Sequence, residues 1–173
     1  VSFITTTGFS ASDYTSWPMF SQILILLTCF VGGCAGSAGG GIKVIRVGTL
    51  FKLGRNEMIK RIHPNAVCSV KLGNIKVEPS TASSIAGFVG VYLLTMLIGT
   101  TIIALTDLDF LTCFTSVVLC LGNIGIGLGG IGMSMTFDVF PDWALWVFSF
   151  LMLVGRLELF TVYSIFTYSF WKR

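Results

Sequence analysis

Gly122-Asn-Ile-Gly-Ile-Gly-Leu-Gly-Gly-Ile-Gly132 is a glycine-rich run that directly follows a short apolar segment, Leu111–Leu121. The segment is too short to cross a bilayer and has the length expected of a re-entrant half-helix. Before it, Ile85–Leu105 is an apolar stretch of about twenty residues, which is long enough to span the membrane. After it, a second long apolar stretch runs from Trp143 to Trp171. Residues 81–173 therefore predict the order spanning helix, half-helix, glycine loop and spanning helix.

The composition places the chain among membrane proteins. Hydrophobic residues make up 54% of the 173 residues, charged residues make up only 11%, and the mean hydropathy is +0.87. Most of the positive charge gathers around one hydrophilic connection and at the C-terminus, whereas acidic residues occupy the other connections. The positive-inside rule then places residues 54–80 and the C-terminus in the cytoplasm. Because topology explains the basic residues, we do not expect nucleic-acid binding.

The beginning of the chain repeats part of this order. Ile4-Thr-Thr-Thr-Gly-Phe9 precedes an apolar stretch that starts at Trp17, so that Gly8 corresponds in position to Gly125. Residues 5–53 therefore predict a second loop followed by a second spanning helix. The repeat is one of architecture, because the side chains of the two copies are largely different.

Both glycine loops suit a cation filter built from backbone oxygens. Irregular backbone at membrane depth is tolerated where it lines water or an ion, and a ring of carbonyls can replace the hydration shell of potassium. Glycine allows consecutive carbonyls to point to one side, and threonine hydroxyls add ligands. We predict that potassium binds the backbone carbonyls of Gly8 and Gly125. The predicted filter residues are Thr6, Thr7, Gly8, Asn123, Ile124 and Gly125. An ordinary glycine-rich turn at a helix end is the alternative for each loop.

A second break, Gly32-Gly-Cys-Ala-Gly-Ser-Ala-Gly-Gly-Gly41, interrupts the apolar stretch that starts at Trp17. Each glycine in a helix costs about 1 kcal/mol relative to alanine, so a continuous helix is not expected here. Arg156 lies thirteen residues after Trp143, at about the same membrane depth as the break. A buried guanidinium needs polar partners, and the free carbonyls of the break can supply them. The predicted gate consists of Arg156 together with Gly32, Gly33, Gly36, Ser37, Gly39, Gly40 and Gly41. A close helix-packing site made of small residues is the alternative.

The remaining polar residues point to no other chemistry. Glu158 lies two residues from Arg156 and faces another side of the helix, so we expect its partner on a neighbouring element, with Lys43 as one candidate. The sequence contains no nucleophile with a base, no carboxylate dyad and no metal-binding spacing among its five cysteines. We therefore expect no enzyme and no cofactor other than potassium as the transported ion.

Four motifs together resemble the TrkH family, the membrane subunits of bacterial Trk potassium uptake systems. They are Thr5-Thr-Thr-Gly-Phe-Ser10, the glycine break continued through Ile42 and Lys43, Arg61-Ile-His-Pro-Asn-Ala-Val67, and Gly155-Arg-Leu-Glu158. The related KtrB proteins are more distant. The resemblance implies an all-α membrane protein with a potassium-channel-like fold, in which four helix–pore loop–helix repeats with re-entrant filter loops surround one pathway in the bacterial inner membrane.

The resemblance also implies how the chain is divided. Residues 1–53 would be the end of the third repeat, residues 54–80 a cytoplasmic linker, and residues 81–173 the fourth repeat. The implied partners are a second copy in a homodimer and a cytoplasmic ring of nucleotide-binding regulatory subunits of the TrkA type. Two residues depart from the family pattern: Ile126 stands where proline is usual, and Ala38 replaces a common threonine.

Two other functions stay open on the sequence alone. One is a secondary cation transporter with broken helices, in which the glycine break forms an alternating-access site. The other is a non-conducting, truncated membrane remnant, because the first two repeats and the start of the third are absent. Since the sequence begins at Val1, we expect it to be a piece of a longer polypeptide, and this piece cannot enclose a complete pore by itself.

Overall fold

The computed structural model describes residues 2–10, 13–34, 36–37, 39–63, 71–72, 75–76, 78–125, 127–131, 137–166 and 171–172. The predicted all-α class is confirmed. Within the described residues, the α-helices are α1 (Met19–Phe30), α2 (Val44–Ile62), α3 (Pro79–Ile103), α4 (Phe110–Gly122), α5 (Asp142–Arg156) and α6 (Leu159–Phe166). Short 3-10 turns are formed by Ala104–Thr106, Gly129–Ile131 and Phe137–Val139. The strands have two residues each: β1 (Val31–Gly32) pairs in parallel with β2 (Ile42–Lys43), and β3 (Lys71–Leu72) pairs antiparallel with β4 (Ile75–Lys76).

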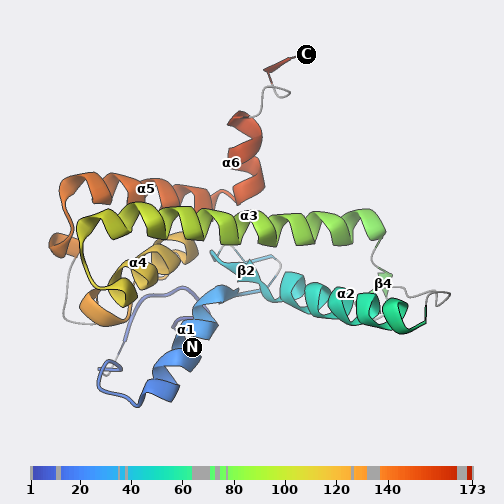
Figure 1. The fold of residues 1–173 in the computed structure, drawn as a ribbon, viewed down its shortest axis with the longest axis horizontal. Coiled ribbons are helices and arrows are strands. Elements are labelled where there is room, and N and C mark those ends of the chain that lie inside the picture. The colour runs from blue at the N-terminus through green and yellow to red at the C-terminus, as the bar shows by residue number, and fades with distance from the viewer. Residues whose placement is uncertain are drawn as a thin grey trace.

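Helix α3 is the longest element of the described residues and runs along most of the long axis of the molecule (Figure 1). Its 25 residues extend about 37 Å at 1.5 Å per residue, enough for the hydrocarbon core. Proline at its first position favours the start there, and Asp107 in the left-handed region (φ 55°) ends the 3-10 turn that follows. The helix predicted at Ile85–Leu105 is thus confirmed and begins six residues earlier, at Pro79, whereas its crossing of the membrane stays a prediction. In the described part of the chain, it is the one unbroken helix long and apolar enough to cross a membrane.

Helix α4 is short and almost wholly buried. Its 13 residues match the predicted half-helix Leu111–Leu121 to within one residue at each end. It packs against α1, α3 and α5, so its polar residues as well as its apolar ones are covered. The main core forms around it, and the largest fully buried side chains there include Tyr92, Ile103, Val117, Leu121, Val154 and Leu159. The re-entry of this helix into the membrane stays a prediction.

The predicted span Trp143–Trp171 is not one continuous helix. Helix α5 ends at Arg156, α6 begins at Leu159, and the two axes are bent by 110°. At the bend, Glu158 adopts a left-handed conformation (φ 62°) that a continuing α-helix cannot accommodate. In Figure 1, α6 consequently turns away from α3, whereas α5 runs beside it.

The predicted start of the cytoplasmic linker, residue 54, falls inside a helix. Helix α2 continues to Ile62 and lies beside the first half of α3 (Figure 1). The loss of apolar residues after Leu53 marks the end of an apolar segment, but the residues that follow are good helix formers. Lys60 and Arg61 in the last turn also complement the negative end of the helix dipole. Residues 64–70, which include most of the predicted His-Pro-Asn-Ala-Val motif, lie outside the described residues.

Candidate ion pathway and gate

The two predicted filter loops meet in the structure. A Cβ atom added to Gly8 would lie only 2.6 Å from the carbonyl oxygen of Ile124. The backbone of the first loop therefore touches the backbone of the second, and the contact requires glycine. Residues far apart in the sequence are in this way brought to one place.

The two loops also share a backbone conformation. Thr6 and Gly8 have φ values of 53° and 76°, and Asn123 and Gly125 have φ values of 55° and 88°. In each loop, two left-handed residues are thus separated by one residue of negative φ. The correspondence of Gly8 with Gly125, predicted from position, therefore extends to conformation.

A cavity of about 240 Å³ lies beside the meeting point. The predicted filter residues that line it are Thr6, Thr7, Asn123, Ile124 and Gly125. Its other walls come from the end of α4 (Leu119 and Cys120), from Phe137 and from Met152 of α5. The cavity therefore adjoins five of the six predicted filter residues, and their role as a cation filter stays a prediction.

The second loop is fastened to α5 at the point where α4 ends. The Asn123 side-chain amide donates to the carbonyl of Met152 (3.2 Å), and the Ile124 amide donates to the carbonyl of Leu119 (3.0 Å). Gly155 lies so close to the carbonyl of Leu121 that a Cβ atom there would collide with it. The close packing of α5 against the end of α4 therefore fixes the second filter loop at its first residue, Asn123.

The predicted gating loop lies directly against both filter loops. Strands β1 and β2 bring its two ends together, pairing Val31 with Ile42 and Gly32 with Lys43. Between them, a Cβ atom on Gly39 would lie 3.2 Å from the Thr6 hydroxyl. A Cβ atom on Gly40 would collide with the backbone of Gly122. The break is therefore non-helical, as predicted, and its small residues permit close backbone contact with the filter region.

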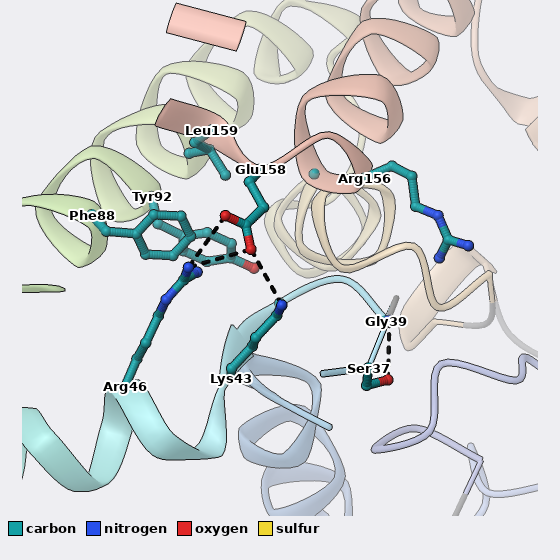
Figure 2. A pocket seen from close by; sticks show the side chains of 11 residues that line it. Ser37, Gly39, Lys43, Arg46, Phe88, Tyr92, Arg156, Glu158 and Leu159 are labelled. Atoms are coloured by element: carbon teal, nitrogen blue, oxygen red, sulfur yellow. Dashed lines mark hydrogen bonds and ion pairs between the residues drawn. The ribbon is translucent and has the colours of Figure 1, made fainter. Parts of the chain in front are cut away.

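Arg156 shares a cavity with this loop but is not buried. The cavity, of about 180 Å³, is lined by Ser37, Gly39 and Gly41 together with Arg156 and Glu158, among others. Figure 2 shows the Arg156 side chain directed away from Glu158, on the side where Ser37 and Gly39 lie. The sequence predicts a buried guanidinium, whereas the structure exposes the side chain, because the elements of this chain cover only part of the end of α5. The gating role of Arg156 stays a prediction.

Glu158 joins the end of the gating loop to the break between α5 and α6. Its carboxylate lies 3.2 Å from Lys43 Nζ and accepts from the Arg46 guanidinium at 3.3 Å through both oxygens (Figure 2). The Arg46 guanidinium carbon also lies 4.0 Å from the centroid of the Phe88 ring on α3, a cation–π distance. Lys43, the candidate partner named from the sequence, is confirmed.

Arg46 and Phe88 are functional candidates that the sequence analysis does not name. A signal for Arg46 is present, because it is a second basic residue three positions after Lys43 in an otherwise apolar stretch. Phe88 has no comparable signal, since one aromatic residue in an apolar helix looks like any other core residue. Ile126 and Ala38, the two departures from the family pattern, lie outside the described residues.

Comparison with known proteins agrees with the geometry. Residues 1–171 match the family model of TrkH, described as a cation transport protein. The chain belongs to the TrkH family. The resemblance read from the four motifs, and the fold class implied by it, are thereby confirmed.

Several TrkH relatives are similar over the whole of this chain. The Trk system potassium uptake protein TrkH of Escherichia coli K12 is 42% identical over 172 residues, which are 99% of this chain and 35% of that protein. TrkH of Halomonas elongata is 39% identical over 173 residues, covering 100% of this chain and 36% of that protein. The crystal structure of the potassium transporter TrkH from Vibrio parahaemolyticus superposes with a TM-score of 0.88 at 37% identity, covering 98% of this chain and 36% of that one. The chain thus spans about a third of the length of these relatives.

Proposed function

We propose that this chain is part of the potassium-conducting membrane subunit of a Trk-type uptake system. The observation that carries the proposal is the contact between two loops of matching left-handed pattern, Gly8 against the carbonyl of Ile124. In this proposal, residues 1–53 are the end of the third pore repeat and residues 81–173 are the fourth. The TrkH relatives have the further length that the first two repeats would need.

The proposed selectivity mechanism uses the backbone of both loops. Carbonyls at Gly8 and Gly125, with the hydroxyls of Thr6 and Thr7, replace part of the hydration shell of potassium. Asn123 and Ile124 complete the second strand. Because each loop supplies one wall, the equivalent loops of the first two repeats would supply the other two.

The proposed gate is the loop of residues 32–41. Its close approach to Thr6 and Gly122 supports a position for this loop below the proposed filter, where it would obstruct an ion that leaves it. Movement of the loop is required for conduction, and Arg156 biases its position by attracting its carbonyls. The ion pairs of Glu158 with Lys43 and Arg46 connect the gating loop to the break between α5 and α6. A shift of the loop would therefore also move the break, and the reverse.

The proposed setting is the bacterial inner membrane, with the basic end of α2 on the cytoplasmic side. A cytoplasmic ring of the TrkA type would act from that side, and two copies of the full subunit would form a homodimer. Both partners are inferred from the family, since the relatives in Escherichia coli and Halomonas elongata are named as proteins of the Trk system.

The test is rubidium uptake, with sodium as competitor, by potassium-uptake-deficient cells that express the complete protein containing this chain. Saturable uptake that resists sodium is the expected result. Absence of uptake, despite normal amounts of protein in the membrane and a co-expressed regulatory partner, would favour the non-conducting remnant.

A secondary cation transporter is the second candidate, and one observation favours it. In each of the two repeats, the helix that follows the filter loop is interrupted. The interruption lies at the glycine break between α1 and α2, and at Leu157–Glu158 between α5 and α6. Paired broken helices are typical of transporters with alternating access. Uptake that stops when the proton or sodium gradient is abolished, at unchanged membrane potential, would favour this mechanism over a channel.

A further inference from the structure

Tyr14 crosses from one repeat unit to the other and binds the second glycine loop. Its hydroxyl donates to the carbonyl of Gly127 at 2.5 Å, and only 2% of the residue is exposed. The ring packs edge-on against Phe3, with 5.4 Å between the ring centroids. A buried phenol needs a hydrogen-bond partner, so the bond fixes both the Tyr14 side chain and the carbonyl that accepts from it.

The next carbonyl along the loop is held in the same manner. The hydroxyl of Thr115, buried in α4, lies 2.9 Å from the carbonyl of Leu128 and shares its one proton between this carbonyl and that of Leu111 at 2.7 Å. The amide of Gly127 donates to the carbonyl of Ile131 at 3.1 Å, which closes the loop on itself. Two consecutive carbonyls, two and three residues after Gly125, are therefore engaged by buried protein groups.

We propose that Tyr14 is a positioning residue for selectivity: by holding the Gly127 carbonyl, it keeps the preceding filter strand, Asn123–Gly125, at the spacing that potassium requires. The strand is then fixed at both ends. At its start, the Asn123 side chain bonds to α5, and after Gly125 the loop is held by Tyr14 and Thr115. Since Tyr14 belongs to the unit that contains Gly8, it also sets one filter loop relative to the other. This inference rests on the proposed function.

The direct test is Tyr14→Phe in the complete protein, with rubidium uptake and sodium competition measured in potassium-uptake-deficient cells. The substitution keeps the ring and its packing on Phe3 but leaves the Gly127 carbonyl unpaired. We expect the preference for rubidium over sodium to fall about tenfold, equivalent to about 1.4 kcal/mol, at a nearly unchanged maximal rate. A residue that only stabilises the fold would instead lower the amount of protein and the maximal rate, and leave ion preference intact.

Two further variants make the test specific. Thr115→Val removes the neighbouring bond at nearly constant volume and is expected to shift ion preference in the same direction. Tyr163→Phe is the matched control, because it removes a tyrosine hydroxyl that contacts Thr95 (2.9 Å) between α3 and α6. We expect the Tyr163 variant to keep the parental preference. Equal loss of preference in the control would overturn the inference.

The outcomes separate this inference from the proposed function. A parent protein that does not discriminate rubidium from sodium would defeat the proposed function, and the inference with it. A selective parent whose Tyr14→Phe variant is equally selective would overturn the inference alone. If Tyr14→Phe does not reach the membrane, parental selectivity in Thr115→Val would overturn it.

Discussion

Gly8 shows how strongly one position can be constrained by a contact between distant parts of the chain. It needs glycine for two independent reasons, a positive φ of 76° and the carbonyl oxygen of Ile124 against its Cα. Either reason alone would disfavour a side chain. Together they couple the shape of the first loop to the position of the second.

Gly8→Ser in the complete protein should therefore displace both filter loops. We expect the preference for rubidium over sodium to fall by about tenfold or more, because discrimination depends on the spacing of carbonyl oxygens. Rubidium uptake with sodium competition measures the effect. Gly90→Ser on α3 is the control, since no heavy atom lies within 4 Å of a Cβ added there. Parental selectivity in a folded Gly8→Ser protein would remove Gly8 from the filter.

Arg156 is the second residue whose role can be tested singly. If its charge holds the gating loop closed, Arg156→Ala should raise rubidium uptake in the absence of the activating partner by about fivefold, on the order of 1 kcal/mol in the closed-to-open equilibrium. Arg156→Lys keeps the charge and should stay close to the parent. Unchanged basal uptake in a well-folded alanine variant would contradict the gate assignment.

At the scale of elements, the short helix α4 organises the site because α1, α3 and α5 surround it. Helix α5 approaches α4 so closely that Gly155 lies against the carbonyl of Leu121, while α1 and α3 cover its other sides. The second filter loop leaves α4 at Asn123, and its direction is set by the packing of α5. The distance between α4 and α5 therefore sets the position of the second filter loop.

Gly155→Ala should separate these two helices. A methyl group there collides with main-chain atoms rather than with a flexible side chain, so we expect a loss of about 1–3 kcal/mol in stability. The midpoint temperature of unfolding of the purified complete protein in detergent is the measurement. Gly90→Ala, which meets open space in the same kind of helix, should leave the midpoint within about a degree or raise it slightly. Equal midpoints for the two variants would argue against close α4–α5 packing in the membrane.

At the scale of the whole molecule, Glu158 is the polar link between the two repeat units. Lys43 and Arg46 belong to the first unit, and Glu158 lies in the break of the second. All three side chains are partly exposed, the carboxylate most of all at 45%. Their attraction is therefore modest in energy, but it acts between the gating loop and the α5–α6 bend.

A charge-swap experiment tests this link. Glu158→Lys should destabilise the complete protein and alter its basal rubidium uptake, and adding Lys43→Glu should restore part of both. We expect a coupling of about 0.5–1 kcal/mol in a double-mutant cycle followed by thermal unfolding, in line with a partly exposed ion pair. The control is the same charge swap on the Glu57–Lys60 pair, whose atoms lie 3.0 Å apart within the single helix α2. Substitutions in this pair should leave rubidium uptake unchanged. Additive effects of the two substitutions would mean that the pair does not join the units.

The sequence by itself determined the features that depend on local chemistry. The span near Ile85–Leu105, the half-helix near Leu111–Leu121 and the break at residues 32–41 follow from apolar length and from the helical cost of glycine. The family followed from four short motifs. For Glu158 the sequence offered Lys43 only as one candidate partner and did not decide between candidates.

Tertiary structure decided what depends on contacts between distant residues. The bend lies at Glu158, whose carboxylate meets Lys43 and Arg46. The number of consecutive apolar residues in this segment does not predict the bend. The hydroxyl of Tyr14 meets the carbonyl of Gly127 only after two units pack together. The exposure of Arg156 likewise depends on which elements surround it. Sequence patterns report the preferences of a segment, whereas these three features report distances between segments, which only packing sets.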